Sequence, residues 1–207
     1  MRPDGIGLPA ADAPILQALV TLGLTLLLAH LYRRHQKAHF LWWAAALAAR
    51  VLSVGAIIAF LATGWEPWLF LHQVFIGWTA LGFLYAAEVF SRQLRWQPRF
   101  WGLVAFPVVW SAIAIFGLEE FALAAGPAVL FLAMATARAG IVFRRYRRRT
   151  GSPAAGALAG VLLLWSLHHL DYPILRARGA WDPWGYYLDI LFVLAMGAGV
   201  VALVLEE

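Results

Sequence analysis

The 207-residue chain contains no cysteine, a single lysine and few charged residues. Without cysteine it forms no disulfide, no thiolate metal site and no cysteine nucleophile. Charged residues make up 13% of the sequence, about half of the roughly 25% typical of soluble domains, and hydrophobic residues make up 63%. A soluble helical protein of this size would need polar helix faces, which such a composition does not supply. The composition therefore favours a membrane protein.

The hydrophobic residues gather in seven apolar stretches, each near or above the length of about 20 residues with which a helix crosses a bilayer. No internal repeat, low-complexity tract or long linker separates them. We therefore predict one all-α domain over residues 1–207, a polytopic membrane protein built as a seven-transmembrane-helix bundle. The predicted helices cover residues 13–32, 40–62, 67–90, 100–117, 121–142, 153–175 and 183–205.

Basic residues lie mainly in every second gap between these stretches, and the second and fourth gaps contain none. Short loops rich in arginine and lysine stay in the cytoplasm, so this pattern predicts an external N-terminus and a cytoplasmic C-terminus in a bacterial inner membrane. It also explains the net charge of +5 without a nucleic-acid partner. The basic residues of the first, third and fifth gaps are Arg33, Arg34 and Lys37; Arg92, Arg95 and Arg99; and Arg144, Arg145, Arg147, Arg148 and Arg149.

Ionisable residues inside the apolar stretches mark candidate sites, because such groups are costly in a bilayer and are usually functional. At a rise of 1.5 Å per residue, three predicted helices place polar groups at a similar depth in the outer leaflet. One interpretation is an outward-open pocket for a small ligand, a proton or a metal ion; the other is a hydrogen-bond network that only joins the helices. The candidate residues are His72, His168, His169, Asp171, Tyr172, Tyr186 and Asp189.

The three histidines among these residues also permit a less favoured interpretation. We predict no cofactor, but depth alone would allow His72 and either His168 or His169 to hold a haem or a transition metal. The two adjacent histidines point about 100° apart on a helix, so at most one of them is expected to face a given pocket.

A second costly residue is Arg50, which lies near the midplane of its predicted helix and too deep to reach water easily. It needs an internal partner. The candidates are Glu88, Asp189 and a backbone carbonyl freed by Pro107 or Pro127. A structural tether between helices is favoured over a role in transport.

Glu88 lies closer to the predicted inner interface. It can alternatively pair with Arg92, one turn later on the same helix, in the favourable order of acid before base. Arg138 lies near the inner end of its helix, and we expect its side chain simply to extend to the interface.

The last two apolar stretches resemble a known family. The segments LHHLDYPILR (residues 167–176) and PWGYYLD (residues 183–189) are similar to the last two helices of the N-terminal membrane sensor region found in bacterial histidine kinases and diguanylate-cyclase-type signalling proteins. The resemblance implies a sensory input domain that signals through its seventh helix to a cytoplasmic kinase or cyclase module. This output module would belong to the same polypeptide or to a separate one. The resemblance also allows a homodimer. This chain itself contains no kinase or cyclase motif, so we expect no enzymatic activity from it.

Other seven-helix classes fit less well. Covalent retinal needs a lysine in the last helix, and the single lysine, Lys37, lies in a predicted loop. Membrane zinc hydrolases need histidines in their last helix, and residues 183–205 contain none. Two alternatives stay open: a small transporter or channel-like protein, and a haem- or metal-binding redox protein.

Overall fold

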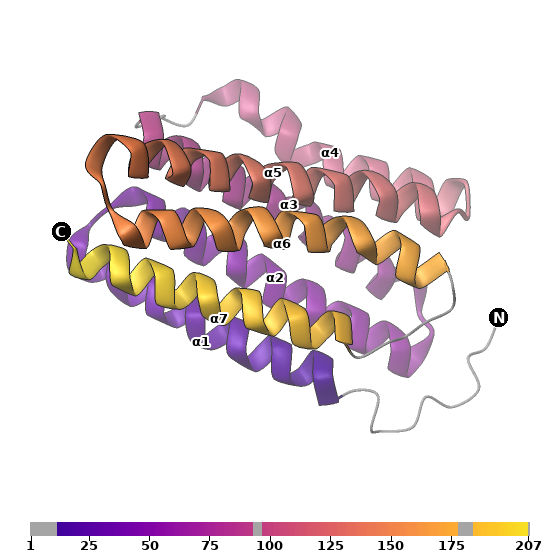
Figure 1. Ribbon diagram of the computed structural model, residues 1–207. Coiled ribbons are helices and arrows are strands. Elements are labelled where there is room, and N and C mark those ends of the chain that lie inside the picture. Colours follow the sequence, from indigo (N-terminus) through magenta and orange to yellow (C-terminus); the bar gives the residue numbers. More distant parts are fainter. Residues whose placement is uncertain (1–11, 93–96, 178–183, 207) are drawn as a thin grey trace.

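A computed structural model describes residues 12–92, 97–177 and 184–206, and every regular element in these ranges is a helix (Figure 1). The α-helices are joined by short connections, and a π-helical turn, η3, extends α4. The elements are α1 (Asp12–His35), α2 (Ala38–Thr63), α3 (Glu66–Arg92), η2 (Pro98–Phe100), α4 (Trp101–Ala112), η3 (Ile113–Gly117), α5 (Phe121–Thr150), α6 (Pro153–Ala177) and α7 (Trp184–Leu205).

Six of these helices, α1, α2, α3, α5, α6 and α7, are long and apolar enough to cross a membrane. The remaining apolar helix, Trp101–Gly117, is shorter. At 1.5 Å per residue it extends roughly 25 Å, less than a hydrocarbon core of about 30 Å. The prediction of an all-helical bundle is therefore confirmed for the described residues, which contain six candidate membrane-spanning helices and one shorter apolar helix. The orientation stays a prediction.

The six long helices form a closed ring. Each packs on the next in the order α1, α2, α3, α5, α6 and α7, and α7 returns to α1. Helix α4 lies outside this ring, mainly against α3 (Figure 1). The close approach of α4 depends on Gly77, because a Cβ atom at that position would lie 2.6 Å from the ring of Pro107.

Tight turns after α2 and α5 make each of these helices antiparallel to the next one (Figure 1). Gly64 ends α2 and Gly151 ends α5, both in the left-handed conformation that glycine adopts without strain. Their N–H groups donate to the carbonyls of Phe60 and Arg147, respectively. As a result, the basic last turns of α1 and α5 lie at the end of the bundle where α7 also ends, called here the arginine-rich end (Figure 1).

Large apolar side chains fill the middle of the ring, and others cover its outside. Trp43, Phe83 and Trp165 form a central aromatic group, with ring centroids 6.0 Å apart between the first two and 5.7 Å apart between the last two. Leucines such as Leu26 and Leu191 instead point outward and are more than half exposed. An apolar exterior around a packed core is what a helical bundle in lipid requires.

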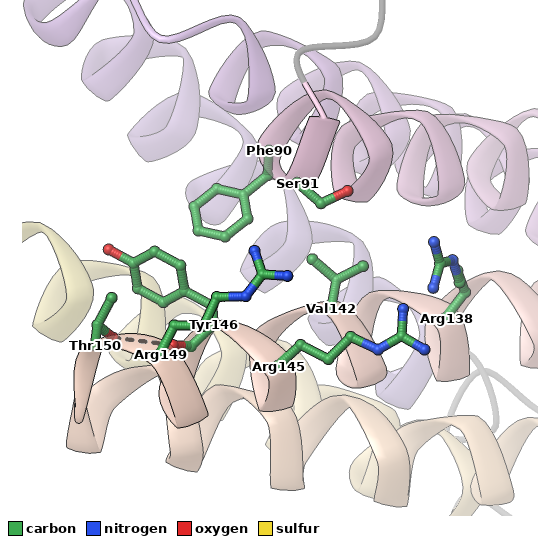
Figure 2. A pocket seen from close by; sticks show the side chains of 8 residues that line it. All are labelled: Phe90, Ser91, Arg138, Val142, Arg145, Tyr146, Arg149 and Thr150. Atoms are coloured by element: carbon green, nitrogen blue, oxygen red, sulfur yellow. Dashed lines mark hydrogen bonds between the residues drawn. The ribbon is translucent and has the colours of Figure 1, made fainter.

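The arginine-rich end also carries charged side chains on an inward-facing surface. Between α3 and α5, three arginines of α5 extend toward α3 (Figure 2).

Candidate functional site

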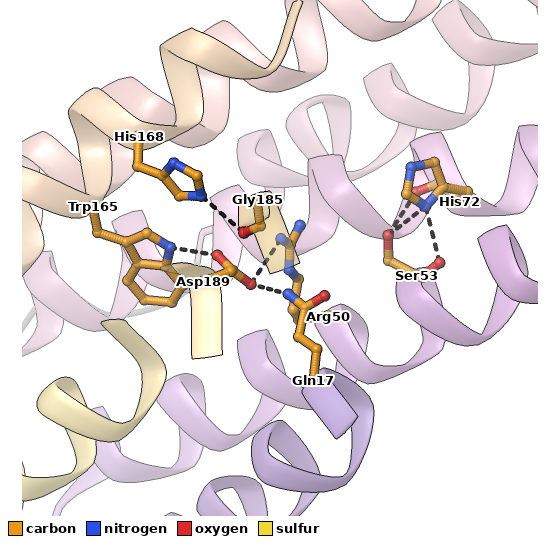
Figure 3. A network of polar contacts seen from close by, with 8 residues as sticks. All are labelled: Gln17, Arg50, Ser53, His72, Trp165, His168, Gly185 and Asp189. Carbon is orange, nitrogen blue, oxygen red and sulfur yellow. Dashed lines mark hydrogen bonds and ion pairs between the residues drawn. The ribbon is translucent and has the colours of Figure 1, made fainter. Parts of the chain in front are cut away.

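The centre of the candidate site is the carboxylate of Asp189 on α7, which is only 2% exposed. It accepts hydrogen bonds from Nε1 of Trp165 at 2.6 Å, from Nη2 of Arg50 at 3.1 Å and from the side-chain amide of Gln17 (Figure 3). These donors come from α6, α2 and α1. One carboxylate therefore connects four helices, and we call this group of residues the Asp189 network.

Helix periodicity explains why Asp189 points inward. It shares one face of α7 with Val193, Met196, Val200 and Leu203, all of them buried, at the spacing of three and four residues that keeps side chains in line. A carboxylate on this face is removed from solvent. The loss of its hydration costs a large amount of free energy unless nearby charges and hydrogen-bond donors compensate for it. The cation of Arg50 and the two neutral donors supply that compensation.

Arg50 forms an ion pair with Asp189, one of the partners expected from the sequence, and both side chains are largely buried. Glu88 has a different partner. Its carboxylate accepts from Nε and Nη2 of Arg138 on α5, at 2.7 and 2.6 Å. The expectation that Arg138 simply extends to the interface is therefore wrong: a carboxylate within reach on α3 competes with water for its guanidinium group.

The two adjacent histidines of α6 point to different surroundings. The buried ring of His169 lies 5.3 Å from the ring of Trp165, whose Nε1 donates to Asp189. Nε2 of His168 lies 3.2 Å from the carbonyl oxygen of Gly185, at the start of α7, and its ring packs on Phe192. His169 therefore borders the Asp189 network, and His168 binds the backbone beside it.

His72 belongs to a separate contact. Its Nδ1 lies 2.9 Å from both the hydroxyl and the carbonyl oxygen of Ser53, which joins α3 to α2. Figure 3 shows this pair beyond Arg50, on the side away from His168 and Trp165. Matched depth did not bring His72 next to the α6 histidines, because depth says nothing about the direction in which a side chain leaves its helix.

This separation bears on the haem interpretation, in which His72 and one α6 histidine would bind a single iron. Figure 3 shows the imidazoles of His72 and His168 on opposite sides of the Asp189–Arg50 pair. Within the described part of the chain, no group of three or more His, Asp or Glu side chains could hold a metal ion. The haem or metal interpretation stays a prediction.

The other predicted site residues are placed only in part. The side chains of Asp171 and Tyr172 lie outside the described residues. Tyr186 is half-buried on the first turns of α7, one turn from Asp189.

Sequence reasoning overlooked several uncharged polar residues. Gln17 is 1% exposed and Thr21, one turn later on the same face of α1, is fully buried. Gln73 on α3 is also fully buried, and neither of its amide atoms has a hydrogen-bond partner among the described residues. The sequence does contain a pattern that identifies two of these residues: Gln17 and Thr21 are polar at a four-residue spacing within an apolar stretch, which places them on one face of the helix.

No known protein family, curated protein or solved structure shows a significant match to this chain. The resemblance to bacterial sensor regions therefore rests only on the two quoted segments in α6 and at the start of α7.

Proposed function

We propose that this chain is a membrane-embedded sensory input domain of a bacterial signalling protein, in which an event at the Asp189 network changes the packing of α7. One observation carries the proposal: α7 is held at both of its ends by polar contacts to other helices. The contact at one end contains a buried ion pair that can be switched between two charge states.

The second contact is made by Glu206, immediately after α7 at the arginine-rich end. Its carboxylate accepts the backbone N–H of Ala154 at 2.9 Å and binds the hydroxyl of Ser152. Both groups belong to the N-terminus of α6, where the helix dipole favours a negative charge. Between the two ends, Gly199 packs closely on Leu158 of α6. A displacement of α7 at Asp189 is thereby transmitted along α6 to the arginine-rich end.

The ion pair supplies the energy for a switch. Neutralising Asp189, by a proton or by a ligand that withdraws it from Arg50, removes the negative charge that this carboxylate places beside the buried guanidinium group. Breaking a buried pair in this way typically costs about 3–5 kcal/mol. Each 1.4 kcal/mol changes an equilibrium about tenfold, so this cost is sufficient to reverse the populations of two helix packings.

The stimulus that suits this site is a proton or a small polar molecule. Three buried polar atoms in or beside the network have no hydrogen-bond partner among the described residues: Oε1 of Gln17, Oγ1 of Thr21 and Nε2 of His169. They offer donors and acceptors that a small polar molecule can use.

The output in this proposal is a kinase or cyclase module that contacts the arginine-rich end, which positive-inside logic assigns to the cytoplasm. To test the proposal, the chain is joined through α7 to a histidine-kinase output, and autophosphorylation is measured across a pH series. Asp189→Asn and Arg50→Gln are compared with Glu88→Gln. The last variant removes a carboxylate from the ion pair that joins α3 to α5.

We expect the first two variants to shift the output to one constant level and Glu88→Gln to respond like the wild type. If Asp189→Asn and Arg50→Gln leave both the level and the pH response unchanged, the sensory proposal is wrong.

Transport is a second candidate, favoured by α4. This helix contains Pro107 and continues into the π-helical turn Ile113–Gly117, and such irregular geometry often occurs at functional sites. Proton uptake into proteoliposomes under an imposed pH gradient separates the two candidates, because a sensor gives no flux above that of protein-free vesicles.

A further inference from the structure

The arginine-rich end contains a basic cavity whose residues play no part in the sensory proposal. On α5, Arg138, Arg145 and Arg149 occur at intervals of seven and four residues and therefore share one face of the helix. Val142 and Tyr146 occupy the same face between them. This face is turned toward α3 (Figure 2).

The cavity between α3 and α5 has a volume of about 400 Å³. Phe90 and Ser91 line it from α3, and the remaining lining residues belong to α5. Figure 2 shows the guanidinium groups of Arg138, Arg145 and Arg149 extending into the space between the two helices. Its wall is partly apolar, because the rings of Phe90 and Tyr146 contact each other with centroids 5.1 Å apart.

The three arginines differ in their charge balance. Arg138 is neutralised by Glu88, as described above. Arg145 and Arg149 form no ion pair or hydrogen bond through their side chains with any residue that the structure describes. Two unneutralised cations one helical turn apart repel each other, so an anion between them is favoured. Guanidinium groups bind phosphate oxygens through paired hydrogen bonds, which makes phosphate the anion that best suits this arrangement.

We propose that this cavity binds the phosphate of an anionic phospholipid headgroup. The cavity lies at the end of two helices of spanning length, at the level where a bilayer presents its headgroups. Its apolar wall of Phe90, Val142 and Tyr146 suits the glycerol backbone and the first methylene groups of a lipid. Basic pockets between membrane helices recognise anionic headgroups in this way. The proposal is independent of the sensory role.

The chain provides a matched control for this idea. Arg144 and Arg148 occur on the same helix at the same four-residue spacing and are exposed, but neither lines the cavity. Replacing either pair of arginines by glutamine removes the same charge from the same turn of α5. A difference between the two double variants therefore reports on the cavity and not on the net charge of the surface.

The experiment uses the full chain in nanodiscs of phosphatidylcholine that contain a small fraction of spin-labelled phosphatidic acid, and it measures the fraction of label immobilised by the protein. The variants are Arg145→Gln/Arg149→Gln, Arg144→Gln/Arg148→Gln and Arg145→Lys/Arg149→Lys. Because a hydrogen bond to a charged group contributes roughly 1.5–3 kcal/mol, we expect the first variant to lose at least about tenfold in affinity. The second should change less than about threefold, as expected for exposed charges.

The lysine variant keeps both charges but loses the guanidinium fork, and we expect it to fall between the other two. Equal losses in the two glutamine variants would show only general attraction to a basic surface and would overturn the proposal. So would the absence of immobilised label in the wild type. Titration with inorganic phosphate forms a separate arm: if millimolar phosphate displaces the lipid completely, the cavity is a site for a soluble phosphate compound and the lipid assignment is wrong.

Discussion

Arg50 and Arg145 are the same residue type in two regions of one bundle, and their surroundings differ completely. Arg50 lies inside the ring, where its guanidinium group binds the buried carboxylate of Asp189. Arg145 lies at the arginine-rich end, exposed and without an ion pair to any described residue. The comparison shows that a charged side chain in the hydrocarbon core is stable only when a counter-charge or hydrogen-bonding group of the protein lies beside it. At the membrane interface, water solvates the charge, so its side chain remains available to bind an external ligand.

The comparison predicts that the largest loss of stability follows from breaking the internal pair. Asp189→Ala removes the carboxylate that binds the buried guanidinium group of Arg50 and accepts from Trp165 and Gln17. We expect a loss of about 3–5 kcal/mol in the free energy of unfolding, measured by reversible denaturation in mixed micelles. The double variant Asp189→Leu/Arg50→Met removes both charges and should recover most of this loss. A single variant as stable as the wild type would show that the ion pair is not required.

An intermediate effect is expected for Glu88→Gln, because the Glu88–Arg138 pair is less buried than the Asp189–Arg50 pair. Its side chains are 17% and 26% exposed, so water compensates in part when the carboxylate is lost. We expect a loss of about 1 kcal/mol in the same unfolding measurement. A loss as large as that of Asp189→Ala would mean that the pair is as dehydrated as the Asp189 network, and the comparison would no longer hold.

The smallest effect is expected at the arginine-rich end. Arg145→Gln/Arg149→Gln removes two cations that bind no described residue and repel each other. We expect the free energy of unfolding to stay the same or to rise by about 0.2–0.5 kcal/mol in lipid-free micelles. The corresponding change in micelles that contain phosphatidic acid should be a loss, because the wild type alone gains stability from the bound headgroup. A loss of several kcal/mol without lipid would indicate an internal partner for these arginines.

Much of the architecture could be predicted because it depends on local properties. Apolar stretches long enough to cross a bilayer define the helices, and glycines such as Gly64 and Gly151 end them where a left-handed residue is required. The helix predicted over residues 100–117 is present as Trp101–Gly117, but only the structure showed that it packs outside the ring. Local composition does not reveal whether an apolar helix lies within a ring or on its surface.

For the candidate site too, some features could be predicted from the sequence and others required the tertiary structure. The sequence by itself determined which residues are costly in a membrane, since the hydropathy around Arg50, His169 and Asp189 is a property of each stretch alone. Only the tertiary structure decided that Arg50 binds Asp189, that His72 instead binds Ser53, and that Glu88 binds Arg138. The physical reason is that a residue's depth follows from its position along a helix, whereas its partner depends on the rotation of that helix and on the order of helices around the ring. Both of these arise from contacts between segments far apart in the chain.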